Sequence, residues 1–449
     1  MRIGRELEKT YLLVPILLLA ILLATAALRA PHLVSLSGLG SAIIVAAPLV
    51  MATYALMALA VAGRGTIDLA IGPLVAFINV VVVKLNGMEL VTGPIGVFAV
   101  ALGIGVIYQV AFAAAVIFVR VQPIIVALSG FLALSGINLV ILPRPGGTAP
   151  DWMAEWGLGS TIFSPILLMI LAATGGWLLF TLTPLHRHLR MMGYDERAAY
   201  TSGVRIGIVR TAAHVIAGLF VGLAAICYSA LIASGDPTQG STLTLTAITA
   251  MVLGGVSLAG GRGGVTGALL GALNLFLIGY VLATFDFGAV QAFVTQLAYG
   301  LILVASLLLT LLVPLVGRHL AFISPFAAFV VLGTVVATIM LHVATAETFA
   351  PAGGELAAAP AADLATRYFL LPVSSPSAVL ELSRLQKAAF GAAAVLVLLV
   401  ITFRLAVAEA ISGRAGAFLH VSIGIAILLG LLAVGMSGGE HLNAVAVPR

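Results

Sequence analysis

Residues 11–28 read YLLVPILLLAILLATAAL, a run of eighteen residues without a charged side chain. A transmembrane helix needs about 20 predominantly apolar residues, and similar runs recur along most of the 449-residue chain. Hydrophobic residues make up 62% of the sequence and charged residues 8%, whereas a soluble domain carries about 25% charged residues. Because the runs are continuous and do not alternate, they predict helices and not barrel strands. We therefore expect an all-α, polytopic membrane protein.

The run 11–28 also has some features of a cleaved signal peptide. It follows a charged start, MRIGRELEKT, and leads into ALRA. However, it is longer than the roughly 7–15 apolar residues of a signal peptide, and Pro31 would follow the cut directly. We interpret it as an uncleaved first spanning helix.

The apolar runs divide the chain into a core, residues 1–320, and a C-terminal extension, residues 321–449. The core holds ten candidate spans: 11–28, 42–62, 66–84, 91–118, 123–142, 163–182, 210–233, 244–259, 264–284 and 289–313. The extension adds three: 323–343, 387–408 and 416–436. Its outer segment, roughly 344–386, is rich in Ala and Pro, and three crossings would leave the C-terminus outside.

Lys and Arg residues indicate the orientation, because cytoplasmic loops carry an excess of them. With the N-terminus in the cytoplasm, the inner loops of the core hold twelve: Arg2, Arg5, Lys9, Arg64, Arg120, Arg187, Arg190, Arg197, Arg205, Arg210, Arg262 and Arg318. The outer loops hold three: Arg29, Lys84 and Arg144. Topology thus explains the net charge of +5, and no nucleic-acid partner is needed. With Cys227 as the single cysteine, we expect neither disulfides nor a metal site.

Charge is concentrated in GYDERAAYTSGVR, residues 193–205. The pattern predicts a short surface helix: Asp195 and Glu196 lie where the helix dipole favours anions, and two alanines, strong helix formers, follow. Gly203 would end the helix in a left-handed cap. About eight residues span roughly 12 Å and cannot cross a bilayer. On charge alone, a solvated loop and a docking element both remain open.

The segment 244–259, TLTAITAMVLGGVSLA, is short for a crossing, since sixteen residues span about 24 Å. It predicts a discontinuous or re-entrant element lining a cavity. Beyond it, Gly263, Gly267 and Gly271 are spaced four apart. That spacing predicts a small-residue face for close helix packing, either within the chain or against another subunit.

Five stretches resemble, in the same order, the permease subunits of bacterial ABC importers for ribose, xylose and related simple sugars. They are GTIDLAIGPLVAF (65–77), VQPIIVALSGFLALSGINLVI (121–141), RMMGYDERAAYTSGVRIGIVRTAAH (190–214), SGDPTQG (234–240) and AITAMVLGGVSLAGGRGGVTGALLGAL (247–273). The resemblance covers roughly residues 10–318. It implies about ten core helices in a bacterial inner membrane, a second permease copy or paralogue, ATPase subunits on the cytoplasmic face and a periplasmic solute-binding protein.

In that family, the loop resembling 193–204 contains a coupling helix that docks into a cleft on the ATPase. The resemblance therefore implies a coupling role for Gly193, Asp195, Glu196, Arg197, Ala198, Ala199, Ser202 and Gly203. Tyr194, Asp195, Arg197 and Tyr200 depart from the commonest family pattern, which we interpret as tuning the choice of ATPase. No G-x-x-x-x-G-K-[ST] phosphate loop occurs in the chain, so we expect ATP and Mg²⁺ on the partner ATPase and no cofactor or enzymatic activity here.

A sugar path needs modest hydrogen-bonding groups. Asp68 is the leading acidic candidate, because an ionisable group in a membrane segment is functional by default; the alternative is structural, with Thr66 capping the third helix and Asp68 in its first turn. The other candidates are Gln122, Asn138, Thr242, Thr246 and Thr249. For the threonines, the alternative is a hydrogen bond back to their own helix. The family usually has an aspartate where Thr246 stands, which leaves a monosaccharide and a polyol both open.

The outer loop 143–162 places Trp152 and Trp156 four residues apart. This spacing predicts a short interfacial helix with its aromatic face in the lipid headgroups, where it would also be placed to meet the solute-binding protein.

These features predict the permease subunit of a binding-protein-dependent ABC importer that carries a monosaccharide or polyol inward. The nearest alternative is a nucleoside or branched-chain amino-acid permease, although the sequence motifs IDLAIG and LGGVSLAGGRG favour a sugar permease. A different class, a proton-coupled secondary transporter using Asp68 as its proton site, would work without an ATPase. A non-transporting scaffold would carry no solute and would leave the threonines unexplained.

Overall fold

A computed structural model describes residues 12–30, 33, 35–63, 67–158, 163–238, 240–285, 293–302 and 304. The chain divides into two compact units, Met1–Leu332 and Gly333–Arg449, and every described residue lies in the first. The extension 321–449 and its three predicted helices therefore lie outside the described residues, and the boundary at residue 320 stays a prediction.

The described residues are helical apart from turns and one isolated bridge between Gly146 and Gly235. The first helices are α2 (Leu13–Arg29), α3 (Leu36–Ala62), α4 (Ile71–Gly87), α5 (Pro94–Ile117), α6 (Pro123–Ile141) and α7 (Asp151–Gly157). They are followed by α8 (Pro165–Phe180), α9 (Pro184–Tyr194), α10 (Glu196–Thr201), α11 (Ile206–Ile232), α12 (Gly240–Leu253) and α13 (Val265–Ala283). Each of the first nine predicted spans coincides with one of these helices, and the tenth is described over the short helix Phe293–Ile302.

Five of the described helices, α3, α5, α6, α11 and α13, are long and apolar enough to cross a membrane. A sixth span is formed if α8 and α9 are counted together, although the pair is bent by 81°. The helices α2, α4 and α12 are apolar but shorter. The prediction of an all-α, polytopic membrane protein is confirmed.

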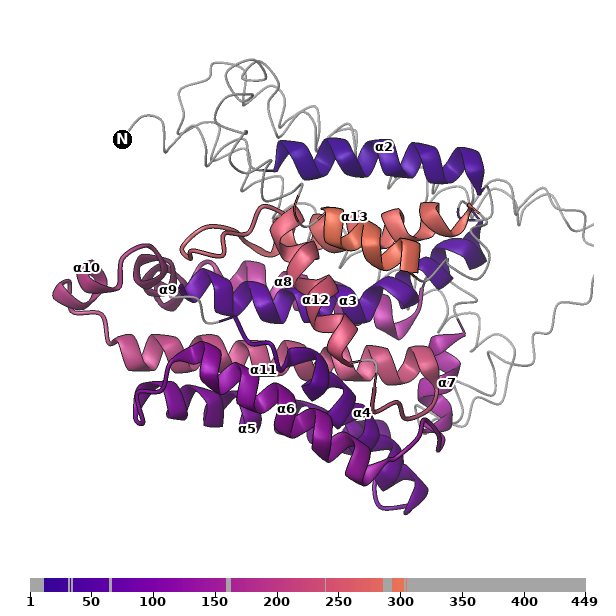
Figure 1. Ribbon diagram of the computed structural model, residues 1–449, viewed down its shortest axis with the longest axis horizontal. Coiled ribbons are helices and arrows are strands. Elements are labelled where there is room, and N and C mark those ends of the chain that lie inside the picture. The colour runs from indigo at the N-terminus through magenta and orange to yellow at the C-terminus, as the bar shows by residue number, and fades with distance from the viewer. Residues whose placement is uncertain are drawn as a thin grey trace, which may run out of the picture. The chain divides into compact units, whose positions relative to one another are not determined.

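The helices α3 and α11 form the centre of the described bundle (Figure 1). From Met51 to Ala62, every side chain of α3 is at most 3% exposed. The hydroxyl oxygens of Tyr54 on α3 and Thr174 on α8 lie 2.8 Å apart, and the Tyr54 ring meets Phe220 of α11 edge-on at a centroid distance of 5.6 Å. In lipid, such packing and hydrogen bonding hold helices together because the hydrophobic effect between them is lost.

The helices α5 and α11 pack against each other backbone to backbone. A Cβ atom on Gly105 would overlap the carbonyl oxygen of Gly218, and one on Gly222 would lie 2.8 Å from the carbonyl oxygen of Ala101. The two helices are therefore antiparallel and too close to be separated by side chains. The two helices therefore move together as one unit.

The predicted glycine face packs within the chain. A Cβ atom on Gly271 of α13 would overlap the carbonyl oxygen of Ala250 on α12, and one on Gly254 would overlap the carbonyl oxygen of Gly267. Gly263 is not part of this face. It lies in the turn before α13 with φ +118°. Although Gly263 is four residues before Gly267, the two glycines are therefore not on one face of a helix.

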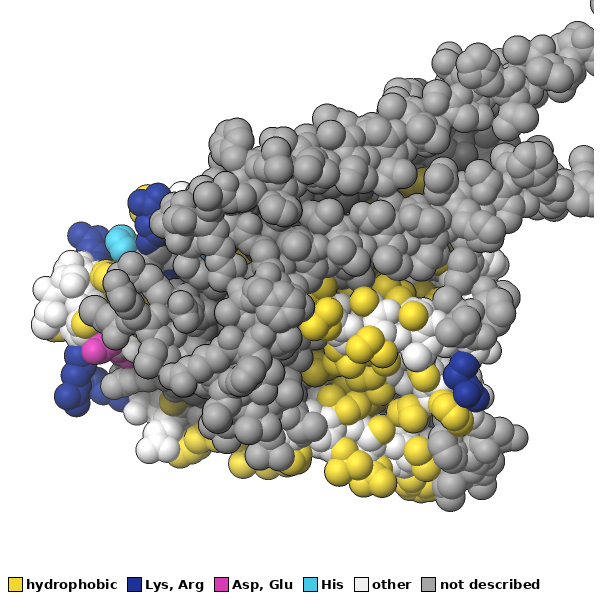
Figure 2. All heavy atoms as spheres, turned by 90° about the horizontal axis from the view of Figure 1, so that it is seen from above, with side chains coloured by type: hydrophobic (Ala, Val, Ile, Leu, Met, Phe, Trp, Pro, Cys, Tyr) yellow, Lys and Arg dark blue, Asp and Glu magenta, His cyan; other side chains and the backbone are white. Residues whose placement is uncertain are grey.

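The basic residues gather at one end of the bundle. We call the end that carries α9, α10 and the 254–264 turn the basic end; its described basic residues are Arg120, Arg187, Arg190, Arg197, Arg205, Arg210 and Arg262. The opposite end has Arg29, Lys84 and Arg144. Figure 2 shows dark blue side chains clustered at the basic end and a smaller group opposite. The charge bias that was counted along the sequence is therefore present in space.

Candidate functional site

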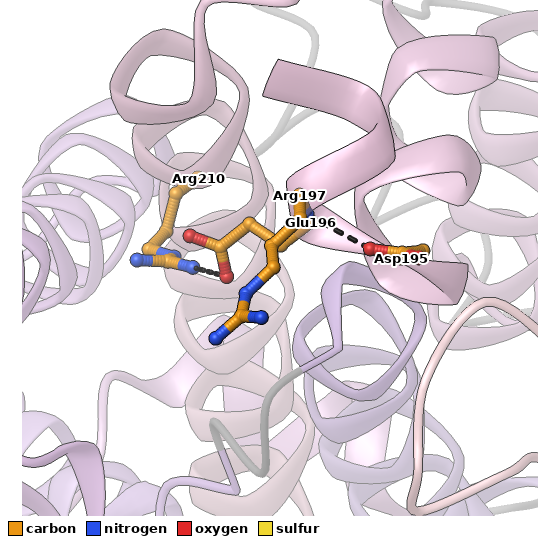
Figure 3. Close-up of polar contacts among 4 residues, drawn as sticks. All are labelled: Asp195, Glu196, Arg197 and Arg210. Carbon is orange, nitrogen blue, oxygen red and sulfur yellow. Dashed lines mark hydrogen bonds and ion pairs between the residues drawn. The ribbon is translucent and has the colours of Figure 1, made fainter. Parts of the chain in front are cut away.

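The helix α10 is the predicted surface helix of the charged stretch. Its N-cap is Asp195, whose Oδ1 accepts a hydrogen bond from the backbone N–H of Arg197 at 2.9 Å (Figure 3). The same oxygen also accepts from the N–H of Ala198 at 3.1 Å. With six residues it is about 9 Å long, shorter than the eight residues predicted. A capped helix this short is a surface element.

The end of α10 is the predicted left-handed glycine cap. Gly203 has φ +85°, its N–H donates to the carbonyl of Tyr200 at 3.0 Å, and the N–H of Val204 donates to the carbonyl of Ala199 at 3.1 Å. These two bonds form a Schellman motif, in which the flanking apolar residues touch. Val204 and Ala199 are both buried, so the cap also docks the helix against the bundle.

The predicted coupling residues fall on two faces of this element. Those that face outward are Asp195, Arg197, Ala198, Ser202 and Gly203, together with the side chain of Tyr200. Gly193 and Ala199 are buried and Glu196 is half-buried. One face is thus available to another protein, while the other anchors the helix.

The anchor to α11 is an ion pair. Oε2 of Glu196 lies 2.9 Å from a guanidinium nitrogen of Arg210 (Figure 3). The Arg210 side chain is 9% exposed and that of Glu196 is 20% exposed. A pair this shielded is screened less by salt than a surface pair, so it links α10 firmly to the first turns of α11.

A second anchor is a cluster of glycines at the basic end. A Cβ atom on Gly193 would overlap the carbonyl oxygen of Val61 and lie 2.6 Å from the backbone nitrogen of Gly261. Gly63, at the end of α3, has φ +83°, and a Cβ there would lie 2.7 Å from the Cα of Gly193. We call Gly63, Gly193, Gly260 and Gly261 the glycine junction. It brings α3, α9 and the 254–264 turn into backbone contact.

Tyr194 and two arginines close over the glycine junction. Nε of Arg190 donates to the carbonyl of Gly261 at 3.2 Å, and its guanidinium donates to the Tyr194 hydroxyl at 3.3 Å. The guanidinium of Arg262 lies 6.0 Å from the centroid of the Tyr194 ring. Arg262 therefore lies over Tyr194 at the end of α9, a neighbour that the sequence did not predict.

The helix α9 was also not predicted. Thr183 is its N-cap and accepts from the N–H of His186 at 3.3 Å, and Pro184 occupies the first turn. Leu189 and Met192 are buried while Arg187 is exposed. A threonine cap, a proline at the first position and apolar residues three apart are signals that would have revealed this helix.

Asp68 lies before α4 and not in its first turn. The helix begins at Ile71 with Ala70 as N-cap, so the predicted start was several residues too early; Thr66 lies outside the described residues. Oδ1 of Asp68 accepts from the N–H of Ala70 at 2.8 Å, and Oδ2 accepts from Nε2 of Gln109 on α5 at 2.6 Å. The side chain is fully buried.

The hydrogen-bond chain continues to α11. Oε1 of Gln109 lies 2.7 Å from Nδ1 of His214. Because the amide nitrogen of Gln109 donates to Asp68, its oxygen faces the ring, so Nδ1 must carry the hydrogen. The imidazole stacks on Phe112 at a centroid distance of 5.0 Å. Sequence reasoning missed Gln109 and His214, although each is a polar residue inside a predicted span.

The hydrogen-bond chain from Asp68 to His214 lies well inside the helical bundle. Gln109 is eight residues from the end of α5 and His214 eight residues from the start of α11, which places both about 12 Å from the basic end. Asp68 is hydrogen-bonded to Gln109 and therefore lies at the same depth, where residues 67–70 are not helical. The segment 244–259, which was expected to be discontinuous, is helical only as far as Leu253, and its role in lining a cavity stays a prediction.

The start of α4 crosses α12 at close range. A Cβ atom on Gly72 would overlap the carbonyl oxygen of Gly240. Oγ1 of Thr244 accepts from the N–H of Gly72 at 2.8 Å and donates to the carbonyl of Leu69 at 3.1 Å. The two short helices are thus joined at the point where the chain re-enters a helix.

The family described as "Branched-chain amino acid transport system / permease component" matches residues 38–313. The chain belongs to this family. The ribose import permease protein RbsC of Escherichia coli K12 is 32% identical over 216 residues, which are 46% of this chain and 67% of that protein. RbsC of Bacillus subtilis 168 is 29% identical over 252 residues, 55% of this chain and 76% of that protein.

A third relative supports the same assignment. The xylose transport system permease protein XylH of Escherichia coli K12 is 36% identical over 125 residues, 28% of this chain and 30% of that protein. No solved structure gives a significant match. The chain is a permease of this family and a multi-pass membrane protein.

In this permease, the predicted path residues have different surroundings. Asn138 is buried and its Nδ2 donates to the carbonyl of Pro73 at 3.0 Å, whereas Gln122 and Thr242 are exposed. The hydroxyl of Thr246 donates to the carbonyl of Thr242 at 3.0 Å, and that of Thr249 donates to Leu245 at 2.9 Å. The structure brings Asn138 to Pro73 in the first turn of α4 and leaves Thr246 and Thr249 bonded to carbonyls of their own helix.

At the opposite end of the permease, the side chains of Trp152 and Asn79 hold two loops through hydrogen bonds. Nε1 of Trp152 donates to the carbonyl of Thr92 at 2.8 Å, and this side chain is 5% exposed. The predicted place for Trp152 in the headgroups is therefore wrong: a buried indole N–H takes a protein acceptor. Nδ2 of Asn79 donates to Oγ of Ser229 and to the carbonyl of Ser234. These bonds hold the start of the SGDPTQG loop.

Among the described residues, no cluster of His, Cys, Asp and Glu is placed to hold a metal.

Substitution of Asp68 should show how the buried chain tolerates change. In Asp68→Asn, the oxygen can keep the Ala70 bond and the new NH₂ can donate to Gln109 if the Gln109 amide turns over. The proton of His214 then moves to Nε2, which has no partner within the described residues. We expect a loss of about 1 kcal/mol, whereas Asp68→Leu removes two buried acceptors and should cost about 2–6 kcal/mol. Thermal unfolding in detergent measures both, and equal losses would contradict this account.

Proposed function

We propose that this chain is the permease subunit of a binding-protein-dependent ABC importer and moves a monosaccharide or polyol into the cytoplasm. The observation that carries the proposal is α10, which presents one exposed face at the basic end while its other face is anchored through Glu196 and the glycine junction. An element held so firmly and left open on one side fits the docking of another protein.

The docking partner in this proposal is an ATPase. The chain has no phosphate loop, so ATP and Mg²⁺ bind the partner and the energy arrives through contact at α10. A second permease copy or a paralogue completes the transmembrane unit, and a solute-binding protein delivers the substrate. The protein lies in the bacterial inner membrane with the basic end and the N-terminus in the cytoplasm, which accords with the excess of Arg at that end.

The substrate class rests on the relatives. Two relatives are named for ribose and one for xylose, and these names favour a neutral, hydroxyl-rich solute over the amino acids in the family description. Of the predicted path residues, Asn138 and the threonines are uncharged, which fits a neutral solute. The carboxylate of Asp68 has both oxygens engaged with Ala70 and Gln109, which argues against its use as an exchanging proton site.

Reconstitution tests this function. We expect the permease, its cognate ATPase and its solute-binding protein to accumulate labelled ribose, xylose or a polyol such as xylitol in proteoliposomes only when ATP is supplied. A protonophore should leave the initial rate unchanged. Accumulation by the permease alone, driven by a pH gradient and lost in Asp68→Asn, would instead identify a secondary transporter.

A further inference from the structure

We propose that Gln109 and His214 are positioning residues, through which the docking helix α10 holds the start of α4. The line runs from Glu196 to Arg210 through an ion pair, along one turn of α11 to His214, and through hydrogen bonds to Gln109 and Asp68. This inference rests on the proposed function, because it assigns a mechanical role to a helix that docks an ATPase.

The first part of the line joins α10 to α11. The Glu196–Arg210 ion pair is shielded from solvent. Arg210 and His214 are four residues apart on α11 and so lie on one helix face, one turn apart. A displacement of α10 is therefore passed to the face of α11 that carries His214.

The second part moves with α11 as a unit. The backbones of α5 and α11 touch at Gly105, Gly218 and Gly222. A movement of α11 therefore moves α5 as well. Closely packed interiors transmit displacement because they have little free volume. Gln109 is then carried by the same body as His214, to which it is hydrogen-bonded at 2.7 Å.

The third part connects this body to α4. Apolar helix faces can slide past each other, but a buried hydrogen bond is directional and has no water to replace it. Nε2 of Gln109 holds Asp68, and Asp68 holds the N–H of Ala70. Residues 67–70 are not helical, so this short segment can shift without breaking a helix. The α4 start then shifts with Thr244 of α12, which is bonded to Leu69 and Gly72.

Asn274 offers a matched control. Its side chain is also a fully buried amide, and its Nδ2 donates to the carbonyl of Pro15 on α2 at 2.8 Å. It joins α13 to α2, and neither helix carries a residue of the line from Glu196 to Asp68. Gln109→Leu and Asn274→Leu each remove a buried amide that donates to another segment, but only Gln109 lies on the line, where its oxygen also bonds His214.

The test measures solute moved per ATP hydrolysed in proteoliposomes that contain the ATPase and the binding protein, with ATPase copurification as a separate readout of docking. We expect Gln109→Leu to keep copurification but to lower the ratio by about 2- to 30-fold, the range of coupling changes seen for such substitutions. Asn274→Leu should leave the ratio unchanged. His214→Phe, which keeps a ring against Phe112, provides a second variant if Gln109→Leu does not fold.

A double-mutant comparison sharpens the test. Glu196→Gln combined with Gln109→Leu should be no worse in ratio than the more severe single variant, whereas effects of Glu196→Gln and Asn274→Leu should add. An unchanged ratio in both Gln109→Leu and His214→Phe, or an equal loss in Asn274→Leu, would overturn the inference while leaving the proposed function intact. A wild-type protein that neither binds an ATPase nor shows ATP-dependent uptake would overturn the proposed function itself.

Discussion

Gly72→Ala is expected to destabilise the folded permease by about 3–5 kcal/mol, a large part of the stability of an ordinary domain. A Cβ atom at this position would overlap the carbonyl oxygen of Gly240 and lie 2.5 Å from Oγ1 of Thr244. The atoms of Gly240 are backbone and cannot rotate away. The helices α4 and α12 would have to separate, which also breaks the hydrogen bonds of Thr244 to Gly72 and Leu69.

Gly136→Ala on α6 is the matched control. This glycine also lies inside a membrane helix, but a Cβ there would meet nothing within 4 Å. Alanine should therefore be neutral or slightly favourable at this position, since glycine weakens a helix by about 1 kcal/mol relative to alanine. The midpoint of thermal unfolding, followed by size-exclusion chromatography in detergent, compares the two. Similar midpoints for both variants would show that α4 and α12 do not cross as closely as described.

Gly193→Ala is expected to lower ATP-dependent uptake by about 100-fold, because a misplacement of about 1 Å in a contact that must be met closely costs that much. The added methyl group would overlap the carbonyl oxygen of Val61 and push against Gly261. The end of α9 would then move away from α3, and α10 would move with it. The loss should appear together in ATPase copurification and in uptake.

Gly207→Ala, at the start of α11, is the control for this variant. A Cβ at Gly207 would lie 3.7 Å from Cγ2 of Ile117, an ordinary van der Waals distance. Uptake by Gly207→Ala should stay close to wild type. If Gly193→Ala transports as well as Gly207→Ala, the glycine junction does not set the place of α10.

Several features of α10, at the basic end, were predictable because they depend on local sequence. The left-handed cap at Gly203 follows from one glycine after a helical run, and the start at Asp195 follows from an acidic residue before two alanines. The requirement for glycine at position 193 was not predictable. Its importance lies in Val61 and Gly261, which are distant in sequence and approach it only in the folded bundle.

The Asp68 region shows the opposite outcome. The residue was found because a carboxylate in an apolar stretch is costly, but its place before α4 was predicted wrongly. A helix that begins inside the bundle can satisfy its first N–H groups with side chains from other helices, such as Thr244, and does not need a local cap. Trp152 was misplaced for a similar reason, since its acceptor on Thr92 belongs to another segment.

The amino-acid sequence alone determined the helical class, the approximate spans, the charge bias between the two ends and the short helix that follows Asp195. These properties depend on composition, on run length and on residues within one helical turn of each other. Only the tertiary structure decided that Gln109 and His214 join Asp68, that four glycines meet at the basic end, and that α4 begins inside the bundle. In lipid, helices meet wherever small residues and buried polar groups fit one another, and such a fit depends on three-dimensional register, which periodicity along one chain does not specify.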